Sequence, residues 1–167
     1  MVPNIEPDAS SVFVSVNGTF YRAIVADGCT DILRGSTTAG RYSKPGQRTL
    51  YMSATEEGVA AAMQAHPLPA GTKRTVYAMA VEAHSIFDLR DDRACEQIGI
   101  RRGDALAPWQ ELVANGGVPT SWGIRECLER AGANGLIDPS RAASGLWHLV
   151  LFRWNIPGAP IVEIIAR

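Results

Sequence analysis

Short runs of β-branched and aromatic residues, separated by glycine and proline, occur at both ends of the chain. Residues 11–16 alternate polar and apolar positions, and residues 19–25 are rich in β-branched and aromatic side chains. Asn17-Gly18 between them favours a tight turn, so the two runs predict a β-hairpin. Comparable runs predict further strands over residues 49–52, 75–81, 135–137, 148–153 and 160–166.

The middle of the chain carries helical signals instead. Ser53 and Glu56 form a Ser-x-x-Glu capping box ahead of an alanine-rich segment that stops before Pro67. Helices are predicted over residues 57–65, 91–98, 104–115 and 120–129. Strands at both ends with helices inserted between them predict an α+β fold with mixed or antiparallel central β-sheets, rather than a doubly wound parallel sheet.

Length and composition fit one compact domain over residues 1–167, with residues 1–10 as a loose N-terminal tail. The chain has 167 residues, of which 46% are hydrophobic. It shows neither a signal peptide nor an apolar run long enough to cross a membrane, so we expect a cytoplasmic protein. Cys29, Cys95 and Cys127 lack the spacing of a zinc site or a disulfide framework, so no metal is expected.

The net charge argues against binding to an anionic polymer or membrane. Sixteen Lys and Arg against 17 Asp and Glu give −1, so a direct nucleic-acid partner, and with it an RNase, is not expected. The charge is uneven, however. Between Asp31 and Glu56 there is no acid but four bases, Arg34, Arg41, Lys44 and Arg48. This stretch is either a solvated basic loop or a site for a small phosphate-bearing molecule.

Other charged positions leave alternatives open. Arg22 lies in an otherwise apolar run, where its side chain points either to solvent or into a pocket. Arg125, Glu126, Glu129 and Arg130 suggest a solvated helix face. The Gly-x-Ser-x-Gly, His-Glu-x-x-His and P-loop motifs are absent, which argues against a serine hydrolase or a zinc enzyme.

Four segments of the chain occur in the order of the motifs of one known protein family. Tyr21-Arg22 matches its first-strand arginine. The run from Gly40 to Gly46, followed by Leu50-Tyr51, matches its Gly-Arg-Trp-Asn, Pro-Gly and tyrosine-strand pattern. Tyr42 and Ser43 stand in place of the Trp and Asn of that pattern. Gly135 to Ser140 matches its Gly-x-x-x-x-Ser segment, and residues 149–152 match the apolar strand that follows. Together these segments resemble the RES-domain toxin family, and the resemblance covers the chain from about Phe20 onward.

The resemblance implies a fold similar to ADP-ribosyltransferases and a role as the toxin of a bacterial type II toxin–antitoxin system. Such a toxin uses NAD+ as its substrate, cleaves the nicotinamide–ribose bond, and passes ADP-ribose to a protein side chain, to water or to phosphate. Its implied partners are a cognate antitoxin with a helix-turn-helix DNA-binding domain and, for the transfer branch, a cellular protein acceptor.

The family's functional residues carry over as Arg22, Arg41, Tyr51 and Ser140. The resemblance implies that the two arginines hold the NAD+ pyrophosphate, that Tyr51 contacts the nicotinamide ribose, and that Ser140 fixes a ribose hydroxyl or the carboxamide. The family glutamate would lie eleven residues past the tyrosine, where this chain has Ala62.

Several explanations of Ala62 remain open. Another acid could take the role of the family glutamate, and Glu57 is preferred over Glu56 and Glu82 because it lies four residues after Ser53 near the tyrosine strand. Glu57 thus joins Arg22, Tyr51 and Ser140 as the expected catalytic set. Alternatively, the alanine was introduced to inactivate a lethal toxin, or the chain is a member with different chemistry. In a further alternative, the chain is a catalytically impaired module that only binds a nucleotide or an antitoxin.

Overall fold

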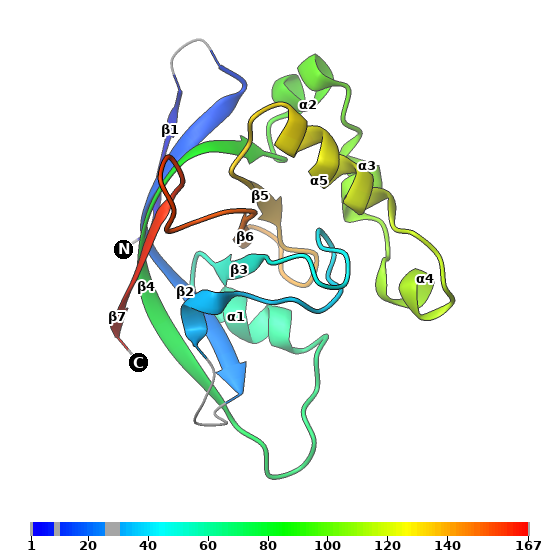
Figure 1. The fold of residues 1–167 in the computed structure, drawn as a ribbon. Coiled ribbons are helices and arrows are strands. Elements are labelled where there is room, and N and C mark those ends of the chain that lie inside the picture. The colour runs from blue at the N-terminus through cyan, green and yellow to red at the C-terminus, as the bar shows by residue number, and fades with distance from the viewer. Residues whose placement is uncertain (1, 9–10, 26–30, 167) are drawn as a thin grey trace.

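The computed structural model describes residues 2–8, 11–25 and 31–166, so that Cys29 lies outside the described part (Figure 1). The strands are β1 (Asn4–Pro7), β2 (Phe13–Val25), β3 (Leu50–Ser53), β4 (Arg74–Asp88), β5 (Gly135–Pro139), β6 (Trp147–Leu151) and β7 (Ile161–Ala166). The helices are the 3-10 turn η1 (Ile32–Arg34) and α1 (Glu56–Met63), α2 (Asp92–Ile98), α3 (Arg102–Leu106), α4 (Gln110–Ala114) and α5 (Thr120–Arg130).

The strands form a mixed sheet in the order β1-β2-β3-β6-β5-β4-β7, and β2 also pairs with β4 along most of its length. Only the β4–β5 pair among the described strands is parallel. The sheet joins a long curved part, β1-β2-β4-β7, to a short part, β3-β6-β5. The α+β fold with a mixed sheet, predicted from the order of the runs, is therefore confirmed.

Alternation along the short strands gives β3-β6-β5 two different faces. Leu50, Met52, Leu149 and Ile137 point into a core shared with β2 and β4. The opposite face carries Val150 and Leu136, which belong to a second core under the helices. Figure 1 shows α2, α3, α4 and α5 on the side of β5 and β6 that faces away from the long strands. Burial on both faces fixes the register of the short strands.

The predicted hairpin is wrong, because Asn17-Gly18 lies inside one continuous strand, β2. Gly18 has φ of +153°, and a Cβ atom there would lie 2.7 Å from the Cα of Pro3. The glycine thus allows the N-terminal segment to approach closely, rather than forming a turn. That segment, expected to be a loose tail, contributes β1, which pairs antiparallel with β2.

Two helical predictions also need correction. The helix predicted over residues 104–115 is split into α3 and α4 around Pro108, whose ring cannot continue a helix. The cap of α1 is Thr55, whose hydroxyl accepts a hydrogen bond from the Gly58 N–H at 3.0 Å. Ser53 remains in β3, so the capping box does not form. In contrast, α2 begins after the cap Asp91, as predicted.

Candidate active site

A cavity of about 600 Å³ opens on the helix-covered face of β3 and β6, a volume typical of small-molecule sites. Its walls come from β2, from residues 36–41 before β3, from α1, and from the start of α4. Segments that are far apart in the sequence therefore meet around it.

Four side chains in one row across neighbouring strands form part of the lining. Tyr21 of β2 lies opposite Ser53 of β3, Ser53 opposite His148 of β6, and His148 opposite Asp138 of β5. Residues directly opposite each other in a sheet point to the same face, and all four line the cavity. The strand register thus places a hydroxyl, an imidazole and a carboxylate side by side.

Arg22 lines the cavity, which settles the alternative left open by its position in an apolar strand. Its Nη1 donates to the Ile32 carbonyl oxygen at 3.4 Å, a long hydrogen bond. No carboxylate of the described residues forms an ion pair with it. Burial lowers its pKa to about 10, so the guanidinium remains charged at neutral pH. A partly buried cation with no carboxylate partner among the described residues favours an anionic guest.

Arg41 also lines the cavity, and it links two walls. Its Nη1 donates to the carbonyl oxygens of Ala107 at 2.8 Å and Ala105 at 3.4 Å, at the end of α3. Burial lowers its pKa, and the charge of Asp138 acts in the opposite direction. Both hydrogen bonds use one nitrogen, so the rest of the guanidinium can serve a ligand.

Helix α5 holds the loop that carries Arg41. Trp122 Nε1 donates to the Gly40 carbonyl at 2.8 Å, and the Ser121 hydroxyl donates to that of Arg41. Arg125, predicted to be solvated, is instead only 2% exposed and donates to the Tyr42 carbonyl at 3.0 Å and to Thr49 Oγ1 at 2.6 Å. Three side chains of one helix thus satisfy successive carbonyl groups of this loop.

Tyr51 lines the cavity and fixes the same loop from the side of the sheet. Its hydroxyl accepts from the Tyr42 N–H at 3.1 Å and lies 2.9 Å from Ser43 Oγ. Burial raises the pKa of this phenol, which keeps it neutral. Gly40 leaves room for it, since a Cβ atom there would lie 2.7 Å from the Tyr51 hydroxyl oxygen.

Asp138 brings a carboxylate into the cavity, and it is the sole acid among the described residues that line it. Its Oδ1 accepts from the hydroxyl of Tyr42 at 2.7 Å, and the side chain of Tyr42 is completely buried. Burial raises the pKa of Asp138 to about 6, while the Tyr42 hydrogen bond and the charges of Arg41 and Arg141 oppose that rise. The carboxylate is therefore ionised at neutral pH.

His148 is the second polar group of this wall that the sequence did not single out. Its Nδ1 lies 2.8 Å from Ser53 Oγ, and burial lowers its pKa, so the ring is neutral at pH 7. A buried strand containing one acid, Gly135 to Pro139, was a weak local signal for Asp138. Only the strand register brings it beside His148.

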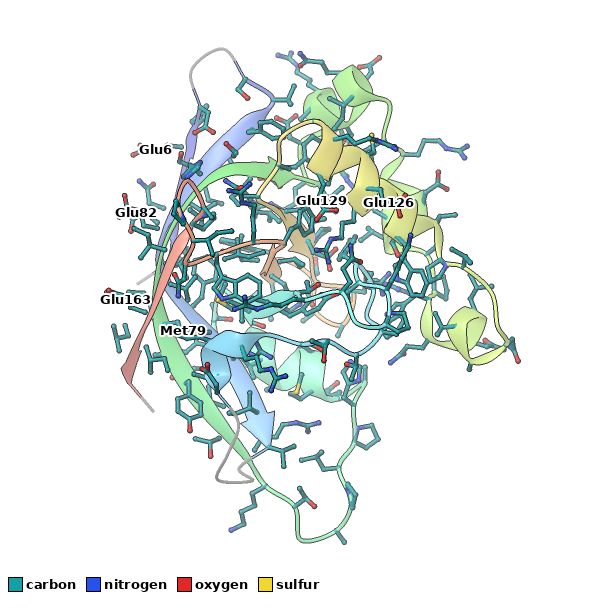
Figure 2. All side chains as sticks on the ribbon, viewed as in Figure 1. Glu6, Met79, Glu82, Glu126, Glu129 and Glu163 are labelled. Carbon is teal, nitrogen blue, oxygen red and sulfur yellow. The ribbon has the colours of Figure 1, made fainter. Side chains whose placement is uncertain are left out.

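The other predicted site residues lie outside the cavity lining. Ser140 accepts from the Ala143 N–H at 3.3 Å and belongs to the turn that joins β5 to β6. Glu56 and Glu57 are exposed in the first turn of α1, whereas Ala62 of the same helix lines the cavity. Figure 2 shows Glu82 with Glu6 and Glu163 on the outer side of the long strands, away from the helices.

The basic stretch does not gather at the cavity as a group. Arg41 lines it, but Lys44 forms an ion pair with Glu126, and Arg48 lies over the Trp154 ring at 4.2 Å. Arg34 is exposed. Of the four basic residues in this stretch, Arg41 alone lines the cavity. The other three are exposed or make contacts outside it.

The described residues contain neither a cluster of metal ligands nor a helix that could span a membrane. In residues 2–8, 11–25 and 31–166, no group of three or more His, Cys, Asp or Glu side chains could hold a metal ion. Over the same part of the chain, no helix has both the length and the apolar character needed to cross a membrane.

Comparison with known proteins adds to this geometry. No curated protein sequence matches the chain. A solved structure of the M. tuberculosis MbcT–MbcA toxin–antitoxin complex contains a chain of similar fold, with a TM-score of 0.59 and 15% sequence identity, covering 98% of this chain and 87% of that chain. The RES domain family model matches residues 19–166. The match leaves out β1 and the start of β2 but includes every later strand and helix and all the residues that line the cavity, and the chain belongs to the RES domain family.

Proposed function

We propose that the protein is the toxin of a toxin–antitoxin system, that it binds NAD+ in the cavity, and that it cleaves the bond between nicotinamide and ribose. The observation that carries the proposal is the cavity of about 600 Å³, which brings Arg22, Arg41 and Tyr51 together. The RES domain match and the fold shared with a chain of a toxin–antitoxin complex support the toxin role and an antitoxin partner.

The arginines suit the anionic centre of the dinucleotide. The pyrophosphate carries two negative charges, and Arg22 and Arg41 offer planar guanidinium groups that bind phosphate oxygens in pairs. Arg22 has no carboxylate partner among the described residues, so a bound phosphate would compensate the cost of its burial. Tyr51, neutral and fixed by its hydrogen bonds, would pack against the ribose at the nicotinamide end.

The chemistry requires little beyond binding and charge stabilisation. The bond between C1′ and the nicotinamide nitrogen breaks, its electron pair remains on the nitrogen, and positive charge develops on the ribose. Nicotinamide leaves as a neutral molecule and needs no general acid. An acceptor then adds to C1′: water gives ADP-ribose and a proton, phosphate gives ADP-ribose phosphorylated at C1′, and a protein side chain gives an ADP-ribosylated protein and a proton.

A second function remains because Ala62, which lines the cavity, carries no acid. In this alternative the protein binds the nucleotide or the antitoxin without catalysis. Incubation with NAD+, followed by measurement of free nicotinamide, separates the two. Release by the wild type supports the enzyme. Binding without release by the wild type, together with release by the variant Ala62→Glu, supports the binding module.

The acceptor is identified in the same assay with labelled NAD+ and a cell lysate. A labelled protein band demonstrates transfer to protein, whereas small-molecule products alone demonstrate attack by water or phosphate. Arg22→Met, which removes a guanidinium from the cavity, should abolish release in either case. Release that persists unchanged in Arg22→Met would contradict the placement of NAD+ in this cavity.

A further inference from the structure

The charges that line the cavity are not all of one sign. Arg22, Arg41 and Arg74 contribute positive charge, and Asp138 contributes the single carboxylate among the described lining residues. NAD+ has the same mixture, because its pyrophosphate carries two negative charges and its oxidised nicotinamide ring carries one positive charge. A buried anion costs free energy to desolvate, and it would not favour the binding of a pyrophosphate alone.

The carboxylate of Asp138 is held in place but not neutralised. Its Oδ1 accepts a hydrogen bond from the uncharged Tyr42 hydroxyl at 2.7 Å. Among the described residues it forms no ion pair, although the charges of Arg41 and Arg141 act on it. Its position is fixed further by the sheet, where it lies opposite His148. A fixed, ionised and unpaired carboxylate in a ligand cavity is suited to a cationic part of the ligand.

We propose that Asp138 is the counter-ion for the positively charged nicotinamide end of NAD+, so that the cavity prefers NAD+ to NADH. This inference rests on the function proposed above and adds a residue to it. In NADH the dihydronicotinamide ring is neutral, so it lacks the charge that Asp138 would face. During cleavage the positive charge moves from the ring to the adjacent ribose, and the carboxylate remains beside it without forming a covalent bond.

The test compares the two dinucleotides on the full chain. Binding of NADH is followed by its own fluorescence, NAD+ is titrated as a competitor, and free nicotinamide is measured in the same samples. We expect the wild type to bind NAD+ at least tenfold more tightly than NADH, and Asp138→Asn to bind the two about equally. Glu163→Gln, which removes an exposed acid from β7, is the matched control and should retain the wild-type preference.

A second variant provides a readout that a purely structural role would not change. The charged and titratable groups around Asp138 are Arg41, Tyr42, Tyr51, Arg141 and His148. Tyr42→Phe removes the hydrogen bond that stabilises the ionised carboxylate, which should raise the pKa of Asp138. The pH at which the preference for NAD+ is lost on acidification should then be higher than in the wild type.

The outcomes separate this inference from the proposed function. If the wild type binds neither dinucleotide, both fail. If the wild type prefers NAD+ and Asp138→Asn retains the same preference, the proposed function stands and the assignment of Asp138 is overturned. A preference that disappears in Asp138→Asn but not in Glu163→Gln supports the assignment, whether or not nicotinamide is released.

Discussion

Two charges of opposite sign, the buried Asp138 and the partly buried Arg22, define this cavity at the scale of single residues. Arg22 and Asp138 both line it. Burial lowers the pKa of Arg22 and raises the pKa of Asp138, and so disfavours the charged form of each side chain. Neither has an ion-pair partner among the described residues. Groups that destabilise the fold in this way are typical of functional sites, so substitutions here should separate binding from stability.

Arg22→Met should weaken NAD+ binding while leaving the fold intact or more stable. The loss of charged hydrogen bonds to phosphate predicts an affinity roughly 10- to 100-fold lower, measured by calorimetry. The methionine fills much of the same space without a charge to desolvate, so the free energy of unfolding in urea should stay the same or rise by about 1 kcal/mol. A variant that loses stability but keeps its affinity would show that Arg22 is structural.

Asp138→Asn should stabilise the protein in a manner that depends on pH. Burial raises the pKa of Asp138 from 3.8 to about 6, so the folded wild type is favoured when the group is protonated and loses that advantage as the pH rises through about 6. Asparagine is neutral throughout. The difference in free energy of unfolding, variant minus wild type, should therefore grow by about 2 kcal/mol between about pH 4 and pH 8.

The control for this titration is Glu163→Gln, because it removes one negative charge at an exposed position. It measures how much the loss of an acid elsewhere on the protein changes the free energy of unfolding over the same pH range. A constant difference for Asp138→Asn would contradict the raised pKa of the buried carboxylate.

At the scale of elements, the site depends on a loop held from two sides. Residues 40–43 receive hydrogen bonds from Trp122 and Arg125 of α5, and contact the Tyr51 hydroxyl of β3. Local sequence patterns predicted α5 and β3, because each has its own periodicity or cap. They could not show that Arg125 is buried, since its charged neighbours are typical of a solvated helix face and its partners lie in a distant loop.

Two glycines provide a matched test of this arrangement. A methyl group at Gly40 would lie 2.7 Å from the Tyr51 hydroxyl oxygen, whereas one at Gly123 of α5 meets open space. Gly40→Ala should therefore lower the free energy of unfolding by about 1–3 kcal/mol and weaken NAD+ binding. Gly123→Ala should raise the free energy of unfolding by about 0.5–1 kcal/mol without changing binding, because alanine favours the helix.

Both changes in the free energy of unfolding are to be measured by urea unfolding, with NAD+ affinity measured in parallel. Equal effects of the two substitutions would show that the contact between Gly40 and Tyr51 does not position the loop.

At the scale of the whole molecule, the order of strands and helices was predictable, whereas the way the strands meet was not. The α+β class followed from runs and caps that act over a few residues. The row that joins Ser53, His148 and Asp138 depends on pairing between β3, β6 and β5, which no local pattern encodes. The resemblance pointed to Arg22, Arg41 and Tyr51, and all three line the cavity. Asp138 was missed, because only the strand pairing places it there.

The near-neutral chain should bind its ligand through a few local charges rather than through a general field. The net charge is −1, and the arginines of the cavity are partly buried, where salt screens them weakly. From roughly 50 to 200 mM salt, NAD+ affinity should fall by less than about tenfold, compared with about 10³- to 10⁵-fold for proteins that bind duplex DNA. A steeper dependence in a binding titration would indicate a broader electrostatic surface.

The long sequence separations across the cavity have a consequence for synthesis of the chain on the ribosome. Trp122 and Gly40 are 82 positions apart, Ser53 and His148 are 95, and Tyr42 and Asp138 are 96. Because such distant contacts form only after the later partner has emerged, a nascent chain that ends before β6 has an incomplete cavity. The proposed cleavage of NAD+ should therefore begin only after β6 has emerged from the ribosome, when an inhibitor made in the same cell can already be present.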